Sequence, residues 1–227
     1  MTSLRSAVLV GATGLIGGSV LDVILSTPAY GRLVVLARRP LGRGSDKLQE
    51  HVVDFERLAA TAGDWQADDV FLCLGTTMAV AGSQEQFRRV DHDYTIEAAR
   101  LARQRGATRL ALVSSVGAAQ RASSFYLRVK GETERDVAEL GYESVHVFRP
   151  SLLVGARPEH RRAEAVGIAV TRAVSWALVG GLRAYRPIDA SRVAGAMVHA
   201  VLAASPGRHV HAYDDILSLS APPPVRA

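Results

Sequence analysis

Residues 6–18, SAVLVGATGLIGG, decide the fold. The short apolar run SAVLV is followed at once by three spaced glycines, Gly11, Gly14 and Gly17, and then by an apolar stretch with helical period. In dinucleotide-binding turns, the first glycine permits the tight turn, the second lets the backbone approach a pyrophosphate, and the third lets the helix pack on the strand. The helix N-terminus then presents free N–H groups to the phosphates. Because the pattern joins a first strand to a first helix, it predicts dinucleotide binding rather than a plain tight turn.

Short β-branched runs alternate with longer stretches of helical period up to residue 150. Several short runs are apolar at successive positions, as strands of a parallel sheet covered on both faces must be. The alternation predicts right-handed crossovers and a doubly wound, parallel Rossmann-type α/β sheet. The expected strands span 6–10, 33–37, 51–53, 70–74, 110–114, 144–148 and 210–213, and the expected helices span 15–26, 84–104, 125–140, 159–182 and 191–204.

The regular alternation ends after Pro150. This last third of the chain is where a substrate-covering segment is expected. We therefore expect a single NAD(P)-binding domain over 1–220, within which 151–220 form a small, mostly helical region on the substrate side. The proline-rich end, 221–227, is expected to be a flexible tail.

The composition is that of an ordinary globular protein, with 227 residues of which 48% are hydrophobic and 22% charged. The single cysteine, Cys73, excludes an internal disulfide and is typical of a reducing compartment. The start of the sequence lacks the features of a signal peptide. The longest apolar stretch, 163–182, is interrupted by Glu164 and Arg172. We therefore expect a cytoplasmic protein with no membrane insertion.

The charge pattern argues against nucleic-acid binding. Lysine and arginine exceed aspartate and glutamate by 27 to 22, but the arginines are spread along the whole chain. A dispersed surplus of arginine is more often a compositional bias than a binding surface. The only closely spaced histidines are His209 and His211, which have no cysteine or acidic cluster beside them. We therefore expect no metal site, and we expect these two histidines to share one face of an edge strand.

Two arginines, Arg38 and Arg39, follow the expected second strand, LVVLA. An NAD-selective site usually carries a carboxylate here, which binds the 2′-hydroxyl of the ribose. Guanidinium groups instead suit a 2′-phosphate, because they form paired hydrogen bonds to its oxygens. NADP(H) is therefore the expected cofactor, and NAD(H) is the less expected one. A solvated surface pair is the alternative interpretation.

Two further segments could contact such a cofactor. Asp54 could accept a hydrogen bond from the adenine amine, and a helix N-cap before FERLAA is the alternative. The backbone of Leu74, at the end of the fourth strand, and of Gly75, directly after it, could approach the cofactor closely. The hydroxyls of Thr76 and Thr77 could hydrogen-bond ribose or phosphate. A plain loop after a strand is the alternative for this segment.

Tyr126 and Lys130 are four residues apart in the expected helix 125–140 and therefore share one face. A free tyrosine titrates near pH ~10, and a nearby ammonium stabilises the phenolate and favours acid–base catalysis. Ser114 and Ser115 end the preceding strand, at the edge where open α/β sheets bind ligands. One of these hydroxyls could hydrogen-bond a substrate carbonyl while the phenol supplies a proton. A strand-ending serine turn is the alternative.

Taken together, the motifs resemble those of the short-chain dehydrogenase/reductase superfamily. They follow the order of that superfamily between residues 11 and 155: GATGLIGG, Asp54, LGTT, SSVGA, YLRVK and FRPSLLVG. Within the superfamily, the fragments VDHDYTIEAARLA and FYLRVKGETE are most similar to the atypical branch of Tat-interacting oxidoreductase-like proteins.

The resemblance implies a role for each matching residue. Tyr126 would be the catalytic acid/base, and Lys130 would promote its ionisation and bind the nicotinamide ribose. Ser115 would orient the substrate carbonyl, with Ser114 as the competing assignment. Many members carry the asparagine of a proton relay where this chain has Asp91, which leaves that relay in question. The pyrophosphate loop would comprise Gly11, Thr13, Gly14, Leu15, Ile16 and Gly17, and the nicotinamide would be bordered by Pro150, Ser151 and Leu153.

These features favour an NADP(H)-dependent oxidoreductase of the short-chain type, which moves a hydride between the nicotinamide and a small carbonyl or alcohol substrate. The alternative is an NADPH-binding regulatory protein that senses redox state with little or no turnover, as some members of the superfamily do. A sugar-nucleotide epimerase would share the cofactor loop, but the C-terminal region leaves little room for a nucleotide sugar. The expected helices 84–104 and 125–140 could also pair in a homodimer.

Overall fold

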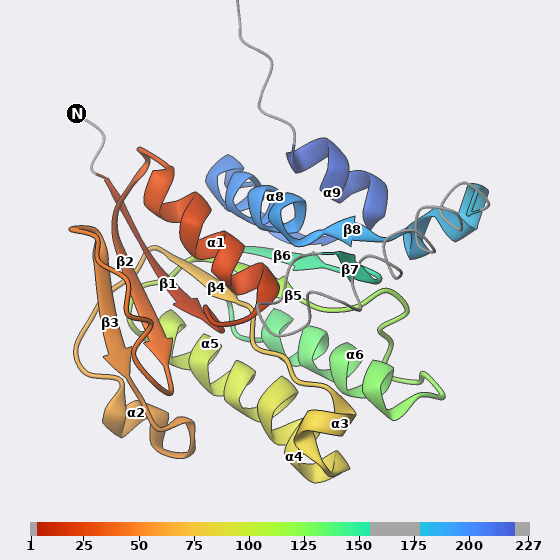
Figure 1. Cartoon of the computed structure of the whole chain (residues 1–227), viewed down its shortest axis with the longest axis horizontal. Helices are drawn as coiled ribbons and strands as arrows, with labels where there is room; N and C mark the ends of the chain where they lie inside the picture. The colour runs from red at the N-terminus through yellow and green to blue at the C-terminus, as the bar shows by residue number, and fades with distance from the viewer. Residues whose placement is uncertain (1–3, 155–177, 221–227) are drawn as a thin grey trace, which may run out of the picture.

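A parallel β-sheet forms the centre of the molecule (Figure 1). The computed structural model describes residues 4–154 and 178–220, and within these ranges the main sheet has seven strands in the order β3-β2-β1-β4-β5-β6-β9. A separate parallel pair joins β7 to β8. The strands are β1 (Arg5–Val10), β2 (Tyr30–Ala37), β3 (Leu48–Val52), β4 (Asp69–Leu72), β5 (Arg109–Val113), β6 (Ser144–Phe148), β7 (Leu153–Val154), β8 (Ile188–Asp189) and β9 (Gly207–His211).

The strand order reverses between β1 and β4. From β1 the chain builds outward through β2 to β3, and from β4 it builds through β5 and β6 to β9 at the other edge. Such a switch point leaves a crevice at the carboxyl ends of the two central strands, where ligands bind in open α/β sheets. Gly11 follows β1 and Cys73 follows β4, so the glycine loop and the LGTT segment meet at this crevice.

Helices cover both faces of the sheet (Figure 1). The long helices α1, α8 and α9 lie on one face, and α5 and α6 lie on the other. Short 3-10 turns occur at Phe55–Arg57 and Gly180–Tyr185, and a π-helical turn occurs at Arg89–Asp93. The helices are α1 (Leu15–Ser26), α2 (Leu58–Thr61), α3 (Met78–Ala81), α4 (Gln84–Arg88), α5 (Tyr94–Gln104), α6 (Phe125–Ala138), α8 (Ala190–Ala203) and α9 (Tyr213–Ser220).

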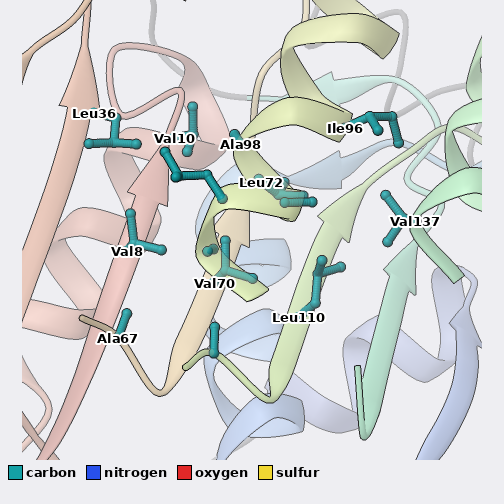
Figure 2. Close-up of a cluster of buried hydrophobic side chains, with 14 of the residues drawn as sticks. Val8, Val10, Leu36, Ala67, Val70, Leu72, Ile96, Ala98, Leu110 and Val137 are labelled. Carbon is teal, nitrogen blue, oxygen red and sulfur yellow. The ribbon is translucent and has the colours of Figure 1, made fainter. Parts of the chain in front are cut away.

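The sheet divides the core into two apolar layers, because successive residues of a strand point to opposite faces. In β1, Val8 and Val10 pack into the layer beneath α5 and α6, whereas Ala7 and Leu9 pack beneath α1 and α8. Figure 2 shows the first of these layers, with Ala98 of α5 lying over the side chains of the central strands. All four β1 residues are fully buried, which explains the continuous apolar run in the sequence.

The edge strand β9 carries His209 and His211, as predicted, on the face where His146 of β6 lies. The rings of His146 and His211 stack at 5.2 Å, and a hydrogen bond of 2.9 Å joins their nitrogens. Ser144 donates its hydroxyl proton to the carbonyl of Ser205. Its oxygen therefore accepts from Nε2 of His146, which leaves Nδ1 of His146 to accept from His211. This hydrogen-bond chain connects β9 to β6.

Most predicted elements are confirmed, but the single helix expected over 84–104 is wrong. The chain there forms α4, the π-helical turn and α5 in succession. The strand expected over 51–53 begins earlier, at Leu48, because the polar sequence LQEH forms a partly exposed edge strand with little apolar signal. The strands expected to reach residues 74 and 114 end at Leu72 and Val113. The strand at 210–213 lies instead at Gly207–His211.

Two predictions fall wholly or mostly outside the described residues. They are most of the helix expected over 159–182 and the tail at 221–227. Among the residues that are described, no helix has the length and apolarity needed to cross a membrane.

Candidate functional site

Two cavities occupy the crevice at the switch point, with volumes of about 290 and 430 Å³. They share lining residues from the glycine loop and the segment after β4, so they form one continuous groove across the ends of β1 and β4. The smaller cavity, here called the inner cavity, is bordered by Leu15, Ile16, Thr77, Asp91, Ser114, Ser115, Tyr126, Lys130, Pro150, Ser151 and Leu153. The larger, outer cavity is bordered by Gly11, Thr13, Arg38, Arg39, Phe55 and Tyr94, and both contact Gly14, Cys73, Leu74, Gly75 and Thr76.

The glycine loop has the geometry that its spacing predicts. Gly11 has a φ of +89°, and a Cβ there would lie 2.4 Å from the carbonyl oxygen of Cys73. A Cβ on Gly17 would lie 2.0 Å from the carbonyl oxygen of Gly11. The first glycine therefore permits the turn and its contact with β4, and the third lets α1 pack against the turn.

Gly14 is the N-cap residue of α1, and it borders both cavities. Within the part of the chain that the structure describes, no side chain caps this end of the helix, and the first turn of α1 contains no acidic residue. The N-terminal N–H groups and the positive end of the helix dipole are therefore directed to the groove. A phosphate-bearing ligand fits this place, because it supplies the acceptors and the negative charge that α1 leaves unmatched.

Arg38 and Arg39 border the outer cavity directly after β2. Both are exposed, and neither forms an ion pair within the described part of the chain. By contrast, the nearby Arg43 pairs with Asp22 at 2.6 Å. The two guanidinium groups at the cavity thus have hydrogen-bonding capacity that an anionic ligand could use.

For Asp54, the structure shows the N-cap alternative. Its carboxylate accepts a hydrogen bond of 3.0 Å from the backbone N–H of Glu56, at the start of the 3-10 turn. Asp54 is not among the residues that border either cavity, and the next residue, Phe55, borders the outer one. The ring of Phe55 lies 5.5 Å from that of Tyr94. Sequence reasoning missed this aromatic pair, although Phe55 directly follows Asp54 and Tyr94 lies in the fragment VDHDYTIEAARLA.

The inner cavity brings together the residues predicted to be catalytic. Tyr126 and Lys130 lie one turn apart on α6, and Ser115 follows β5. Lys130 is 5% exposed, whereas Tyr126 is partly exposed, with its ring 5.5 Å from the ring of Phe87. Within the described residues, the hydroxyl of Ser115 has one hydrogen-bond partner, the carbonyl of the neighbouring Val116, at 3.3 Å. A hydroxyl, a phenol and an ammonium therefore line one cavity beside the glycine loop.

Asp91 connects this set to the segment after β4. Its carboxylate, 1% exposed, forms an ion pair of 2.8 Å with Nζ of Lys130 and accepts a 2.8 Å hydrogen bond from the backbone N–H of Thr76. The residue lies in the π-helical turn, a distortion that often occurs at functional sites. Sequence reasoning identified Asp91 only as a departure from an asparagine, and did not predict its pairing with Lys130.

A second buried carboxylate, Glu134, lies one helical turn beyond Lys130 on α6. It accepts hydrogen bonds from the hydroxyl of Ser114 at 2.5 Å and from Arg149 at 2.6 and 2.9 Å. Arg208 of β9 adds a contact of 3.1 Å. The sequence reasoning missed Glu134, although its spacing of four from Lys130 continues the helix face that begins at Tyr126.

Cys73 borders both cavities and is partly exposed, but it has the character of an unreactive thiol. Burial raises its pKa to about 12, and the nearby Lys130 offsets only part of that rise. At neutral pH the group is therefore a thiol rather than a nucleophilic thiolate. Cys73 therefore acts as a small, largely apolar side chain directly after β4 rather than as a nucleophile.

Two sequence relatives identify the family. Protein HTATIP2 of Rattus norvegicus is 39% identical over 164 residues, which cover 70% of this chain and 67% of that protein. Protein FMP52, mitochondrial, of Coccidioides immitis is 32% identical over 217 residues, which cover 90% of this chain and 88% of that protein. The chain belongs to the HTATIP2/FMP52 family. No general model of a protein family matches it.

Solved structures show the same fold as this HTATIP2/FMP52-family protein. MoeE5 in complex with UDP-glucose and NAD superposes with a TM-score of 0.65, covering 95% of this chain and 80% of that one at 18% identity. Human epimerase family protein SDR39U1 with NADPH superposes with a TM-score of 0.59, covering 91% and 74% at 16% identity. At such identities the likeness establishes the predicted Rossmann-type fold alone, and it does not decide between NAD and NADP.

The expectation of a cytoplasmic protein is wrong. Family members that match 90% of the chain, from Coccidioides immitis and two Aspergillus species, are named as mitochondrial proteins. The expectation rested on a missing signal-peptide pattern and a single cysteine. Neither feature distinguishes the cytoplasm from another reducing compartment.

Proposed function

We propose that this HTATIP2/FMP52-family protein is an NADP(H)-dependent oxidoreductase of the short-chain type, acting on a small carbonyl or alcohol. One observation carries the proposal: Ser115, Tyr126 and Lys130 border the same cavity of about 290 Å³ that the glycine loop and the LGTT segment enter. An enzyme that reduces a carbonyl needs a proton donor, an oxyanion-stabilising donor and a bound nicotinamide close together. The groove supports all three requirements.

Each residue of the groove has a role in this proposal. The N-terminus of α1 would hold the diphosphate, and Arg38 and Arg39 would hold a 2′-phosphate. Pro150, Ser151 and Leu153 would border the nicotinamide, which supplies or accepts the hydride when bound. In the direction of reduction, the Tyr126 hydroxyl gives its proton to the substrate oxygen while the Ser115 hydroxyl donates a hydrogen bond to it. Lys130 places a positive charge beside the phenol as it loses the proton.

Substitution of the phenol tests the proposal directly. Tyr126→Phe removes one hydroxyl and keeps the ring that packs on Phe87. We expect NADPH-linked reduction of a panel of small aldehydes and ketones to fall by about a hundredfold or more, since general acid catalysis contributes about that much. NADPH affinity should change little. Tyr213→Phe, on α9 and away from both cavities, is the matched control and should retain full activity.

Two outcomes would contradict the assignment. Undiminished reduction by Tyr126→Phe would exclude the phenol as the acid. Tight NADPH binding by the unmodified protein with no turnover over a broad carbonyl panel would instead favour the regulatory alternative, in which the protein binds the cofactor to report redox state.

A further inference from the structure

We propose that Asp91 determines which redox form of the cofactor the protein prefers, by adding a buried negative charge beside the nicotinamide end of the groove. The inference rests on the proposed binding of a nicotinamide cofactor in the two cavities. It concerns the relative affinity for the oxidised and reduced forms rather than the chemistry of a substrate.

The electrostatic argument begins with the ion pair. Asp91 and Lys130 are both buried, border the inner cavity and contact each other at 2.8 Å. Because both side chains are buried, a charge in this place acts on its surroundings more strongly than one at the surface. The pair as a whole is close to neutral. With an uncharged residue in place of Asp91, the ammonium of Lys130 would leave the inner cavity with a full positive charge.

That difference matters because the two cofactor forms differ in charge at one ring. The oxidised nicotinamide is a cationic pyridinium, whereas the reduced ring is neutral. An unpaired ammonium repels the cation and has a much smaller effect on the neutral ring. Asp91 therefore stabilises bound NADP⁺ relative to bound NADPH, and so favours the oxidised state of the bound couple.

The carboxylate of Asp91 also supports the loop after β4, and this structural effect must be distinguished from the effect of its charge. It accepts the N–H of Thr76, and a Cβ on Gly75 would lie 3.7 Å from its Oδ1. Asp91 thus underlies the loop that contacts both cavities. Loss of this support would weaken every ligand of the groove, whereas loss of charge would affect the cationic ring selectively.

Asp91→Asn separates the two effects, because an amide oxygen can still accept from Thr76 but carries no charge. Binding of NADPH is measured by its fluorescence, and binding of NADP⁺ and of 2′,5′-ADP, which lacks the nicotinamide, by competition. We expect the Kd for NADP⁺ to rise about tenfold more than that for NADPH, and the Kd for 2′,5′-ADP to stay within about twofold. A tenfold change in this ratio raises the potential of the bound couple by about 30 mV.

Asp93→Asn is the matched control, since Asp93 lies in the same turn but is exposed and contacts His92. It should leave all three Kd values unchanged. If Asp91→Asn does not unfold cooperatively, Asp91→Ser, which also removes the charge, replaces it. An unchanged NADP⁺/NADPH ratio, or an equal loss for all three ligands, would overturn the inference. Failure of the unmodified protein to bind any of the three ligands would instead overturn the proposed cofactor site.

Discussion

The hydroxyl of Ser114 donates a hydrogen bond of 2.5 Å to a carboxylate oxygen of Glu134, and both residues are buried. Glu134 also accepts two hydrogen bonds from Arg149. A serine hydroxyl has a single proton, so Ser114 has none left to donate to a substrate oxygen. Ser115 borders the inner cavity, and among the described residues its hydroxyl makes a single long contact, of 3.3 Å with the carbonyl of Val116. We therefore expect Ser115, rather than Ser114, to stabilise the substrate oxygen.

Alanine substitutions should distinguish the two serines. Ser115→Ala should lower kcat/KM for carbonyl reduction by about a hundredfold, as loss of one oxyanion donor does, with little effect on stability. Ser114→Ala should retain most of the activity and lower the free energy of unfolding by about 1–2 kcal/mol, because it removes a buried hydrogen bond. Steady-state kinetics and urea unfolding measure the two effects. The opposite pattern would assign the role to Ser114.

Arg38→Ala should distinguish the two cofactors. We expect the Kd for NADPH to rise about 10- to 100-fold, because charge-assisted hydrogen bonds to a 2′-phosphate are lost. The Kd for NADH should change by less than about twofold, since NADH has no such phosphate. Fluorescence titration measures both. Arg43→Ala is the control, because Arg43 pairs with Asp22 and does not border either cavity. Equal losses for both cofactors would refute the role of Arg38.

Two adjacent glycines of α1 should respond in opposite ways to alanine. A Cβ on Gly17 would lie 2.0 Å from the carbonyl oxygen of Gly11, so Gly17→Ala must displace the loop or the helix. We expect a loss of stability of about 2–4 kcal/mol, as for other overpacked sites, and loss of cofactor binding. Gly18→Ala meets only an ordinary contact at 3.5 Å and should stabilise the helix by about 0.5–1 kcal/mol. Thermal unfolding of both variants tests the geometry, and equal behaviour would contradict it.

The histidines of β6 and β9 should make stability depend on pH. Burial, aided by the nearby His211 and His209, lowers the pKa of His146 to about 4 from an ordinary value of 6.5. The unfolded chain therefore binds this proton first as the pH falls. The stabilising contribution is complete above about pH 6.5 and disappears as the pH falls toward 4. Burial also lowers the pKa of His211, which acts in the same direction.

Between pH 7 and pH 5, the free energy of unfolding should fall by about 2 kcal/mol through His146 alone. Urea unfolding at a series of pH values measures this slope. His146→Phe keeps an aromatic ring that can stack on the neighbouring imidazoles but cannot titrate, so its slope should be smaller by that amount. An unchanged slope in this variant would show that the hydrogen-bond chain to Ser144 and His211 does not control the acid sensitivity.

The parts of the fold that sequence predicts well are those with strong local signals. The strand–glycine–helix unit from Arg5 to Ser26 is recognisable because burial on both faces makes residues 7–10 a continuous apolar run, and because the loop tolerates no Cβ at Gly11 and Gly17. The Tyr126 and Lys130 pair is visible for a similar reason, since helix geometry alone places the two side chains on one face.

The parts that sequence did not predict depend on contacts between distant segments. The π-helical turn has no local signature, and it accompanies the contacts of Asp91 with Lys130 and with the N–H of Thr76. The assignment of Ser114 to a structural role likewise depends on Glu134, which lies 20 residues later on another element. A single sequence without contacts therefore shows which residues can do the chemistry, but not which of two neighbouring serines is available for it.

The position of β9 at the edge of the sheet determines when this edge can fold during translation. Its partner β6 is made first, and residues 149–206 must be translated before β9 exists. During that interval the imidazole of His146 lacks its partner on β9, and the β6 edge of the nascent sheet has open backbone hydrogen-bonding groups. Completion of this side of the sheet is thus a late step of biosynthesis, and a nascent protein arrested before residue 207 would expose an edge open to association.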